Sequence, residues 1–292
     1  MTNQKDCPWA RGYAFKSLIT LAIVWLMPLW PVVQASGLAP ARATSHPSAG
    51  AVDLRPNFKK WGLPLRSQGG RGTCSVFTLT GAIEYALASE RGTGTVSSVE
   101  FLNWASNQAT TNSSDGGFFA DLWKGFERYG ICAETKLPYR AHYDPDLQPD
   151  PGALAQARAA IRMHLQLNWI KRWDVTTGLT EAQFQEIKQV LAGGWPVCAG
   201  MRWPRHESWR KNVLRMATPA EVFDGHSVLL VGFKEDPVQP GGGVFLIRNT
   251  GGGVQDGALP YDYARAYIND AAWVFAAKVH FAALKTRPTD RP

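Results

Sequence analysis

In the first third of the chain, apolar residues recur at intervals of three and four positions. Val76, Leu79, Ile83 and Leu87 follow this spacing behind a glycine-rich stretch, which predicts a helix with one apolar face. Cys74 lies in its first turn. The positive end of a helix dipole stabilises a thiolate and a developing oxyanion, whereas most free cysteines are small buried hydrophobic residues. The helix pattern by itself supports both interpretations of Cys74.

Further helices are predicted mainly in the first half of the chain. They cover residues 96–107, 119–129, 153–165 and 181–192. Ser97 or Ser98 is the expected N-cap of the first, Gly130 ends the second, and the capping-box sequence from Thr180 to Gln183 begins the last. The proline-rich segment 144–152 is predicted to cross the surface between the two halves of the chain.

From residue 195 onward the apolar runs are short and are bounded by glycine or proline, which is typical of strands. Strands are predicted over residues 195–201, 225–233, 244–249 and 272–280, with an earlier one over 169–175. Helices followed by strands indicate an α+β protein with two unlike lobes. The helical lobe is expected over about 66–150 and the β lobe over about 165–285, within a folded domain that spans 52–285.

Residues 1–35 have the pattern of a secretory signal peptide. A basic flank precedes an uncharged, mostly apolar run, and the segment ends on Val33-Gln34-Ala35. Pro28 and Pro31 interrupt the run, which disfavours a retained membrane anchor. Residues 36–51 are predicted to be a flexible linker and 286–292 a tail. We therefore expect an exported protein, secreted or periplasmic, that has no stable membrane association after signal removal.

The net charge and its distribution along the chain disfavour one class of function. The formal net charge is +7, and removal of residues 1–35 leaves +5. The Arg and Lys residues are scattered and do not cluster with aromatic residues, which disfavours a nucleic-acid interface. The cysteines and histidines show no close pair at metal-ligand spacing, so no metal site and no cofactor are predicted.

Three cysteines follow the predicted signal peptide, namely Cys74, Cys132 and Cys198. An odd number leaves at least one thiol unpaired in an exported protein. A disulfide between Cys132 and Cys198 would leave Cys74 free, but the sequence does not decide the pairing.

A cysteine nucleophile needs a base, and that base needs an orienting partner. His226 begins one predicted strand and Asn249 ends the next. On neighbouring antiparallel strands, Asn249 could accept a hydrogen bond from one ring nitrogen while the other nitrogen faces Cys74. Taken singly, a histidine at a strand start is more often structural, and an asparagine before glycine is more often a turn residue.

Together these motifs resemble the papain-like cysteine peptidases over residues 52–280. Gln68 and Cys74 match the family's Gln-x5-Cys segment. The family's Asn-Gly-Gly turn is matched by Ser114-Asp115-Gly116-Gly117-Phe118, and its Gly-Ile and Tyr-Pro-Tyr marker by Gly130-Ile131 and Leu137-Pro138-Tyr139. The strand that carries the family's histidine is matched at His226, and its Lys-Asn-Ser segment is matched by Arg248-Asn249-Thr250. The resemblance implies a two-lobe fold with a helical first lobe, an antiparallel β-barrel-like second lobe, and the active-site cleft between them.

The resemblance also implies roles for individual residues. Catalytic roles fall on Cys74 as nucleophile, His226 as base, Asn249 as its orienting partner and Gln68 as oxyanion donor. Substrate-binding roles fall on Gly116, Gly117, Phe118, Gly200 and Ser227. Gly200 and Ser227 are small, so the pocket for the side chain two before the cut is expected to be roomy and to prefer bulky apolar residues. The expected partners are a polypeptide substrate and protein inhibitors.

Several departures from the family pattern keep other functions open. Arg71 stands where the family has a disulfide-forming cysteine, Ser75 replaces a tryptophan, and Gly251-Gly252 lack the tryptophan that shields the His–Asn hydrogen bond. No long inhibitory propeptide is expected. The alternatives are a catalytically silent binding protein of this fold, and a thiol acyl transferase or amidase that uses the same three residues.

Overall fold

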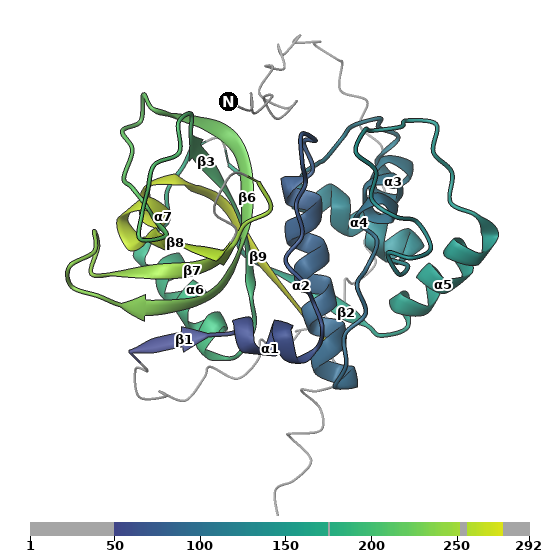
Figure 1. Ribbon diagram of the computed structural model, residues 1–292, viewed down its shortest axis with the longest axis horizontal. Helices are drawn as coiled ribbons and strands as arrows, with labels where there is room; N and C mark the ends of the chain where they lie inside the picture. The colour runs from purple at the N-terminus through teal and green to yellow at the C-terminus, as the bar shows by residue number, and fades with distance from the viewer. Residues whose placement is uncertain (1–49, 175, 252–255, 277–292) are drawn as a thin grey trace, which may run out of the picture.

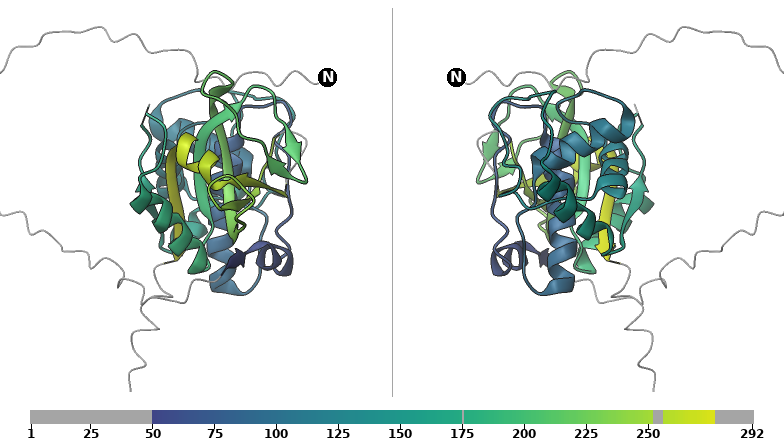
Figure 2. Two further views of the ribbon diagram at one scale, coloured as in Figure 1. Left: turned by 90° about the vertical axis from the view of Figure 1, so that its left-hand side faces the viewer. Right: turned by 90° about the vertical axis from the view of Figure 1, so that its right-hand side faces the viewer.

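The computed structural model describes residues 50–174, 176–251 and 256–276. The predicted signal peptide, all of the linker before residue 50 and the predicted tail lie outside these ranges. Within them, most of the strands lie on one side of one long helix, α2 (Cys74–Arg91), and a group of helices lies on its other side, as Figure 1 shows. The two side views in Figure 2 agree, with the sheet facing the viewer in one and the helical lobe in the other.

Four helices build the first lobe, and their ends follow the capping residues of the sequence. They are α2, α3 (Val99–Thr110), α4 (Phe119–Tyr129) and α5 (Pro151–Ile161). The Ser98 hydroxyl caps α3 by accepting from Phe101 N, and the Asp150 carboxylate caps α5 by accepting from Ala153 N. Proline at the first position of α5 needs no hydrogen-bond partner for its nitrogen, so α5 begins two residues before the predicted start at 153.

Helix α2 is buried around nearly its whole circumference, not only on the one apolar face that its spacing predicts. Its first fifteen residues, 74–88, are buried except for the partly exposed Gly81. Glu84 is buried on it, and its carboxylate is paired with the Arg66 guanidinium at 2.7 Å and accepts from Ser97 N. A helix in contact with both lobes must be buried on all sides, and its one charged core residue must be paired.

In the described residues, nine strands form one sheet on the other side of α2. The strands are β1 (Ala51–Asp53), β2 (Leu165–Lys171), β3 (Val197–Pro204), β4 (Trp209–Arg210), β5 (Val213–Leu214), β6 (Val222–Glu235), β7 (Gly243–Arg248), β8 (Asp256–Pro260) and β9 (Ile268–Ala276). Their order is β2-β9-β3-β6-β7-β8-β5-β4, with β1 paired to β6. Only β5 and β8 pair in parallel. The α+β prediction is confirmed, but the described strands do not close into a barrel.

Three further helices complete the described fold. They are α1 (Arg55–Lys60), α6 (Glu181–Ala192) and α7 (Tyr261–Tyr267). The capping box predicted at Thr180 and Gln183 is present, with both reciprocal hydrogen bonds formed. Six elements were not predicted from the sequence, because each is too short for its hydrophobic period to be recognised: β1, α1, β4, β5, β8 and α7.

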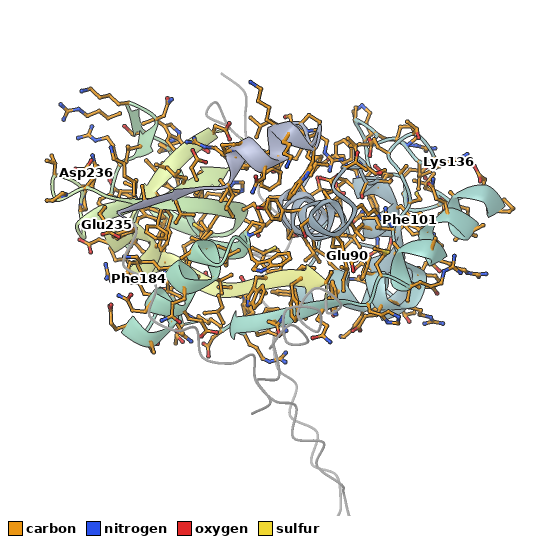
Figure 3. The ribbon with its side chains drawn as sticks, turned by 90° about the horizontal axis from the view of Figure 1, so that it is seen from below. Glu90, Phe101, Lys136, Phe184, Glu235 and Asp236 are labelled. Carbon is orange, nitrogen blue, oxygen red and sulfur yellow. The ribbon has the colours of Figure 1, made fainter. Side chains whose placement is uncertain are left out.

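The main core lies between α2 and the sheet, and a smaller cluster lies under α5. Figure 3 shows Phe101 of the smaller cluster and Phe184 of α6 on opposite sides of α2. Phe184 packs edge-on against Phe245 and Tyr261, with ring centroids 5.4 and 5.1 Å apart. The described part of the chain contains no helix that is both long and apolar enough to cross a membrane.

Candidate active site

Cys74 is the first residue of α2, and its side chain is 1% exposed. The N-cap Thr73 makes no side-chain cap to the helix; its hydroxyl shares a 2.6 Å hydrogen bond with the Tyr139 hydroxyl. The thiol is 3.7 Å from the Gly225 carbonyl oxygen. The sulfur is thus at the positive end of the longest helix and next to the strand that carries His226.

A bulge in the sheet precedes His226. Met201 on β3 pairs with His226 on β6, but Trp203 pairs with Phe223, so two residues of β6 face one residue of β3. One of the two is Gly225, whose φ of +102° suits glycine. A bulge bends its strand and changes the direction of the next side chain, and here that side chain is the His226 imidazole.

His226 and Asn249 are hydrogen-bonded as the sequence predicts. The His226 Nε2 and the Asn249 Oδ1 are 2.8 Å apart. Asn249 Nδ2 donates to the Gly251 carbonyl at 2.7 Å, which turns its oxygen toward the ring, so Nε2 carries the proton in this bond. Asn249 is fully buried at the end of β7, whose antiparallel partner is β6.

The surroundings of His226 favour its protonated form. Burial alone lowers the pKa of the imidazole, but the hydrogen bond and charge of Cys74, the hydrogen bond of Asn249 and the carboxylate of Glu207 together raise it above its ordinary value. A histidine that stays protonated beside a cysteine is the partner that a thiolate requires.

A tryptophan covers the His226 ring from a direction that the sequence did not predict. Trp203 on β3 is fully buried, and its ring centroid lies 4.6 Å from that of His226. Its Nε1 donates to Glu207 at 2.8 Å, and Trp209 Nε1 donates to the same carboxylate at 2.9 Å. Trp203 thus packs an aromatic ring against His226 from β3, whereas the tryptophan that the family pattern places at Gly251-Gly252 is absent.

The Gln68 amide is held in one orientation beside the same site. Its Nε2 donates to the Arg71 carbonyl at 2.8 Å, and its Oε1 accepts from the Thr250 hydroxyl at 3.0 Å. The backbone N–H of Gln68 also donates to the Thr250 carbonyl. An amide nitrogen carries two hydrogens, so the bond to the Arg71 carbonyl uses one of the two N–H groups.

The family model described as papain family cysteine protease matches residues 49–255. The chain belongs to this family. No match was found among curated proteins, so the comparison with relatives rests on solved structures.

Three similar solved structures are distant in sequence. They include xylellain, a cysteine protease from Xylella fastidiosa (20% identity, 78% of this chain and 87% of that chain, TM-score 0.59). Digestive procathepsin L 3 of Tenebrio molitor larval midgut has 19% identity over 81% and 73%, with TM-score 0.55. The ragweed pollen allergen Amb a 11 in its proform has 19% identity over 80% and 68%, with TM-score 0.57. At these identities the likeness establishes the fold alone.

The residues predicted to pair with substrate lie directly beside the loop before α2. A Cβ at Gly116 would lie 2.2 Å from the Gly72 carbonyl oxygen, and Gly116 has a φ of +108°, so this position needs glycine. The backbone N–H of Gly117 donates a hydrogen bond to the Ser75 hydroxyl at 3.4 Å. Phe118 packs edge-on against Trp173, at 5.2 Å between centroids, and Trp173 is 51% exposed.

The space beside Gly200 differs from the roomy apolar pocket that the sequence predicts. A Cβ at Gly200 would lie 2.0 Å from Asp270 Oδ1, so the Asp270 carboxyl fills the position of a side chain. Gly200 pairs with Ser227 on one side and Asp270 on the other. Burial raises the pKa of Asp270 to about 7, against the lowering effects of the Gly200 backbone and Lys171.

The other two cysteines of the described chain are free and buried, so the disulfide considered between Cys132 and Cys198 does not form. Burial raises the pKa of Cys132 to about 12, and burial also raises that of Cys198. Neither thiol ionises readily, in contrast to what a nucleophile requires. Within the described ranges, no group of three or more His, Cys, Asp or Glu side chains could hold a metal ion.

Sequence reasoning missed Trp203, Glu207 and Asp270. Trp203 and Glu207 are four residues apart, a spacing too common in sequences to indicate a contact. They lie near His226 only because β3 pairs with β6. Asp270 lies in an apolar stretch, Ile268 to Ala276. A lone carboxylate in a buried strand is rare without a function or a partner, and this was the one signal that the sequence offered.

Proposed function

We propose that this chain is an exported cysteine peptidase that hydrolyses peptide bonds through Cys74, His226 and Asn249. One observation carries the proposal: at the start of α2 the Cys74 thiol lies 3.7 Å from the carbonyl of Gly225, the residue before His226, and His226 is in turn hydrogen-bonded to Asn249. A nucleophile, a base and an orienting group in this order are what thiol acyl chemistry requires.

The proposed reaction has two stages. The Cys74 thiolate attacks the peptide carbonyl carbon, the C–N bond breaks, and protonated His226 gives its proton to the leaving amine. The thioester that forms is then attacked by water, which transfers a proton to His226, and the carboxylic acid leaves as the thiolate re-forms. Asn249 holds the imidazole with Nε2 toward itself, so the other ring nitrogen faces the sulfur.

The oxyanion of both stages would be held by Gln68 and by backbone N–H at the α2 N-terminus. The fixed Gln68 amide supports this role, since one of its N–H groups is committed to Arg71 and the other would donate to the oxyanion. Preorganised donors of this kind are worth about 3 kcal/mol of activation free energy each. Gly116 and Gly117 would pair with substrate backbone beside Phe118, Gly200 and Ser227. The proposed substrate is a polypeptide, and protein inhibitors are further proposed partners.

Peptide cleavage by the purified chain tests this function. We expect hydrolysis of an internally quenched peptide library with products that carry free carboxyl termini. Addition of an amine nucleophile such as hydroxylamine separates the reaction types, because an acyl transferase would pass the acyl group to the amine in preference to water. Absence of cleavage by protein whose Cys74 is fully reduced would contradict the proposal and favour a silent binding protein.

Asp270 gives a pH-dependent prediction for substrate preference. Because its pKa is raised to about 7, the carboxyl is neutral below that pH and negative above it. The quantity compared is kcat/KM for a substrate with Arg two residues before the cut, divided by kcat/KM for the same substrate with Leu there. We expect this ratio to rise about 10-fold from about pH 5.5 to about pH 8.5. This factor corresponds to about 1.4 kcal/mol, the contribution of a charged hydrogen bond.

Asp270→Asn provides the control, since it keeps the shape of the side chain and removes its ionisation. The Arg-to-Leu ratio of this variant should stay flat across the same pH range. A ratio in the unaltered protein that does not change with pH would place the Asp270 carboxyl outside the substrate pocket.

A further inference from the structure

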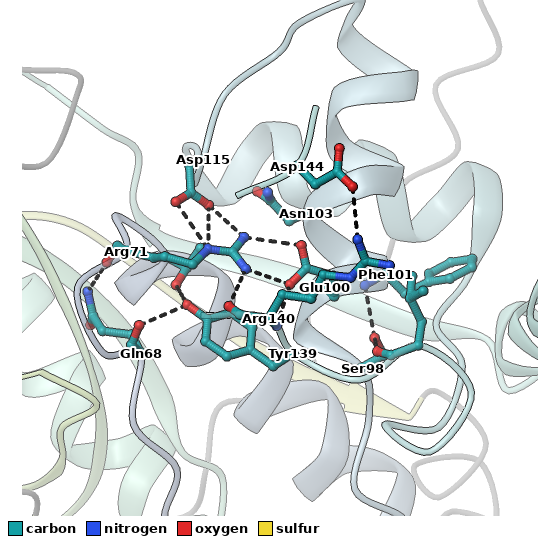
Figure 4. A network of polar contacts seen from close by, with 12 residues as sticks. Gln68, Arg71, Ser98, Glu100, Phe101, Asn103, Asp115, Tyr139, Arg140 and Asp144 are labelled. Atoms are coloured by element: carbon teal, nitrogen blue, oxygen red, sulfur yellow. Dashed lines mark hydrogen bonds and ion pairs between the residues drawn. The ribbon is translucent and has the colours of Figure 1, made fainter. Parts of the chain in front are cut away.

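Arg71 is almost fully buried in the loop before α2, with 6% of its surface exposed. Its guanidinium uses all five N–H donors (Figure 4). Nε and one terminal nitrogen donate to Asp115 at 3.2 and 2.8 Å. The two terminal nitrogens donate to Glu100 at 2.6 and 3.2 Å, and one also reaches the Arg140 carbonyl at 2.9 Å.

Charge and aromatic contacts fix this guanidinium further. Its carbon lies 4.5 Å from the centre of the Tyr139 ring and 5.8 Å from that of Tyr143. Burial lowers the pKa of Arg71, but the hydrogen bonds of Asp115 and Glu100 outweigh that effect and raise it. The group is a permanent cation between two carboxylates, with no donor left over.

One end of this network reaches the proposed oxyanion donor. The Gln68 Nε2 is bonded to the backbone carbonyl of Arg71 itself. The Tyr139 hydroxyl, beneath the guanidinium, donates to the Gln68 carbonyl at 2.9 Å and meets the Thr73 hydroxyl, one residue before Cys74. Displacement of Arg71 would therefore move the Gln68 amide and the residue that precedes the nucleophile.

The other end of the network reaches the loop of residues 115–117, which is proposed to pair with substrate. Asp115 directly precedes Gly116, whose N–H donates to Asn103 Oδ1 at 3.0 Å. Asn103 and Glu100 are both on α3. Asp115 and Gly116 are thus held from two sides, by Arg71 from the loop before α2 and by α3, while Gly116 lies against the Gly72 carbonyl.

We propose that Arg71 is a positioning residue, an ionic joint that holds the Gln68 loop and the Asp115-Gly116-Gly117 loop in the relative position that turnover needs. This inference rests on the proposed peptidase function. Arg71 occupies the position where the papain family has a disulfide-forming cysteine, and the ionic joint gives this replacement a physical role. Because the joint is ionic, reductants that keep Cys74 in the thiol state leave it intact.

The test compares Arg71→Met with Arg140→Met. Arg140 makes an exposed ion pair with Asp144, and its backbone carbonyl, which Arg71 uses, is unchanged by substitution. We expect kcat/KM for peptide hydrolysis to fall about 100-fold in Arg71→Met, the scale of a misplacement of about 1 Å, and to change less than about twofold in Arg140→Met. Alkylation of Cys74 by iodoacetamide, which needs neither Gln68 nor the 115–117 loop, should keep its rate within about threefold in both variants.

A neutral triple variant separates positioning from stability, because Arg71→Met leaves two buried carboxylates unpaired and lowers stability. Arg71→Met with Glu100→Gln and Asp115→Asn removes those charges, so its unfolding midpoint should recover while kcat/KM stays at least about 10-fold low. Recovery of both would overturn the inference, as would full activity of Arg71→Met. Absence of peptidase activity in the unaltered chain would instead contradict the proposed function.

Discussion

Replacement of Cys74 by alanine should abolish peptide hydrolysis, with a fall in rate on the order of 10⁵-fold or more, as for nucleophiles in comparable triads. The methyl group of alanine cannot form the thioester, and no other ionisable sulfur lies beside His226 in the described structure. The fold should persist, because Cys74 is at a helix end where a small side chain suffices. The measurement is kcat/KM on a cleaved peptide, with circular dichroism to confirm folding.

Cys132→Ala is the matched control for this experiment. Cys132 is as buried as Cys74, at 2% exposed against 1%, but it lies in the smaller cluster of the helical lobe. Its removal should leave hydrolysis within about twofold of the unaltered protein. Residual hydrolysis by Cys74→Ala that matches the unaltered chain would rule out the proposed role of Cys74.

Replacement of Trp203 by alanine should cause the largest loss of stability among the site residues. Trp203 is fully buried, contacts His226 and donates to Glu207. Such a truncation costs about 3–5 kcal/mol in free energy of unfolding. It also opens the His226–Asn249 hydrogen bond to water, so kcat should fall about 10-fold or more through weaker orientation of the imidazole. Denaturant unfolding and steady-state kinetics measure the two effects.

Two further variants separate the parts of this prediction. Trp203→Phe keeps an aromatic cover on His226 but loses the bond to Glu207, so it should retain more activity than Trp203→Ala. Trp173→Ala removes a tryptophan that is 51% exposed and should change stability by less than about 0.5 kcal/mol. Unchanged kcat in a folded Trp203→Ala variant would show that Trp203 does not shield the pair.

The sequence predicted those elements whose signals are local. Gly130 and the Thr180–Gln183 capping box identified helix ends, and Ser98 is the one of the two predicted caps, Ser97 or Ser98, that the structure uses, since a cap bonds to residues within one turn. The apolar runs around His226 and before Asn249 identified two strands, and their antiparallel pairing is confirmed. The sequence resemblance also identified the family, which the family match confirms.

The rest could not be predicted because it depends on contacts between distant residues. The burial of α2 on all sides follows from its place between two lobes, not from its own pattern. Trp203 reaches His226 only through a strand pairing with a bulge. Likewise, Arg71 meets Glu100 and Asp115 across 29 and 44 residues, and its replacement of cysteine predicted only an absent disulfide. The functional roles of all the candidate site residues stay predictions, namely those of Cys74, His226, Asn249, Gln68, Gly116, Gly117, Phe118, Gly200 and Ser227.

Covalent labelling with a peptidyl epoxide tests the central claim most directly. The reduced protein is incubated with the inhibitor, its intact mass is measured, and the modified residue is located by peptide mass spectrometry. The account predicts one inhibitor molecule per chain, attached to the Cys74 sulfur, with loss of labelling in His226→Ala because the thiolate loses its partner. An unmodified protein, or an adduct confined to Cys132 or Cys198, would contradict it.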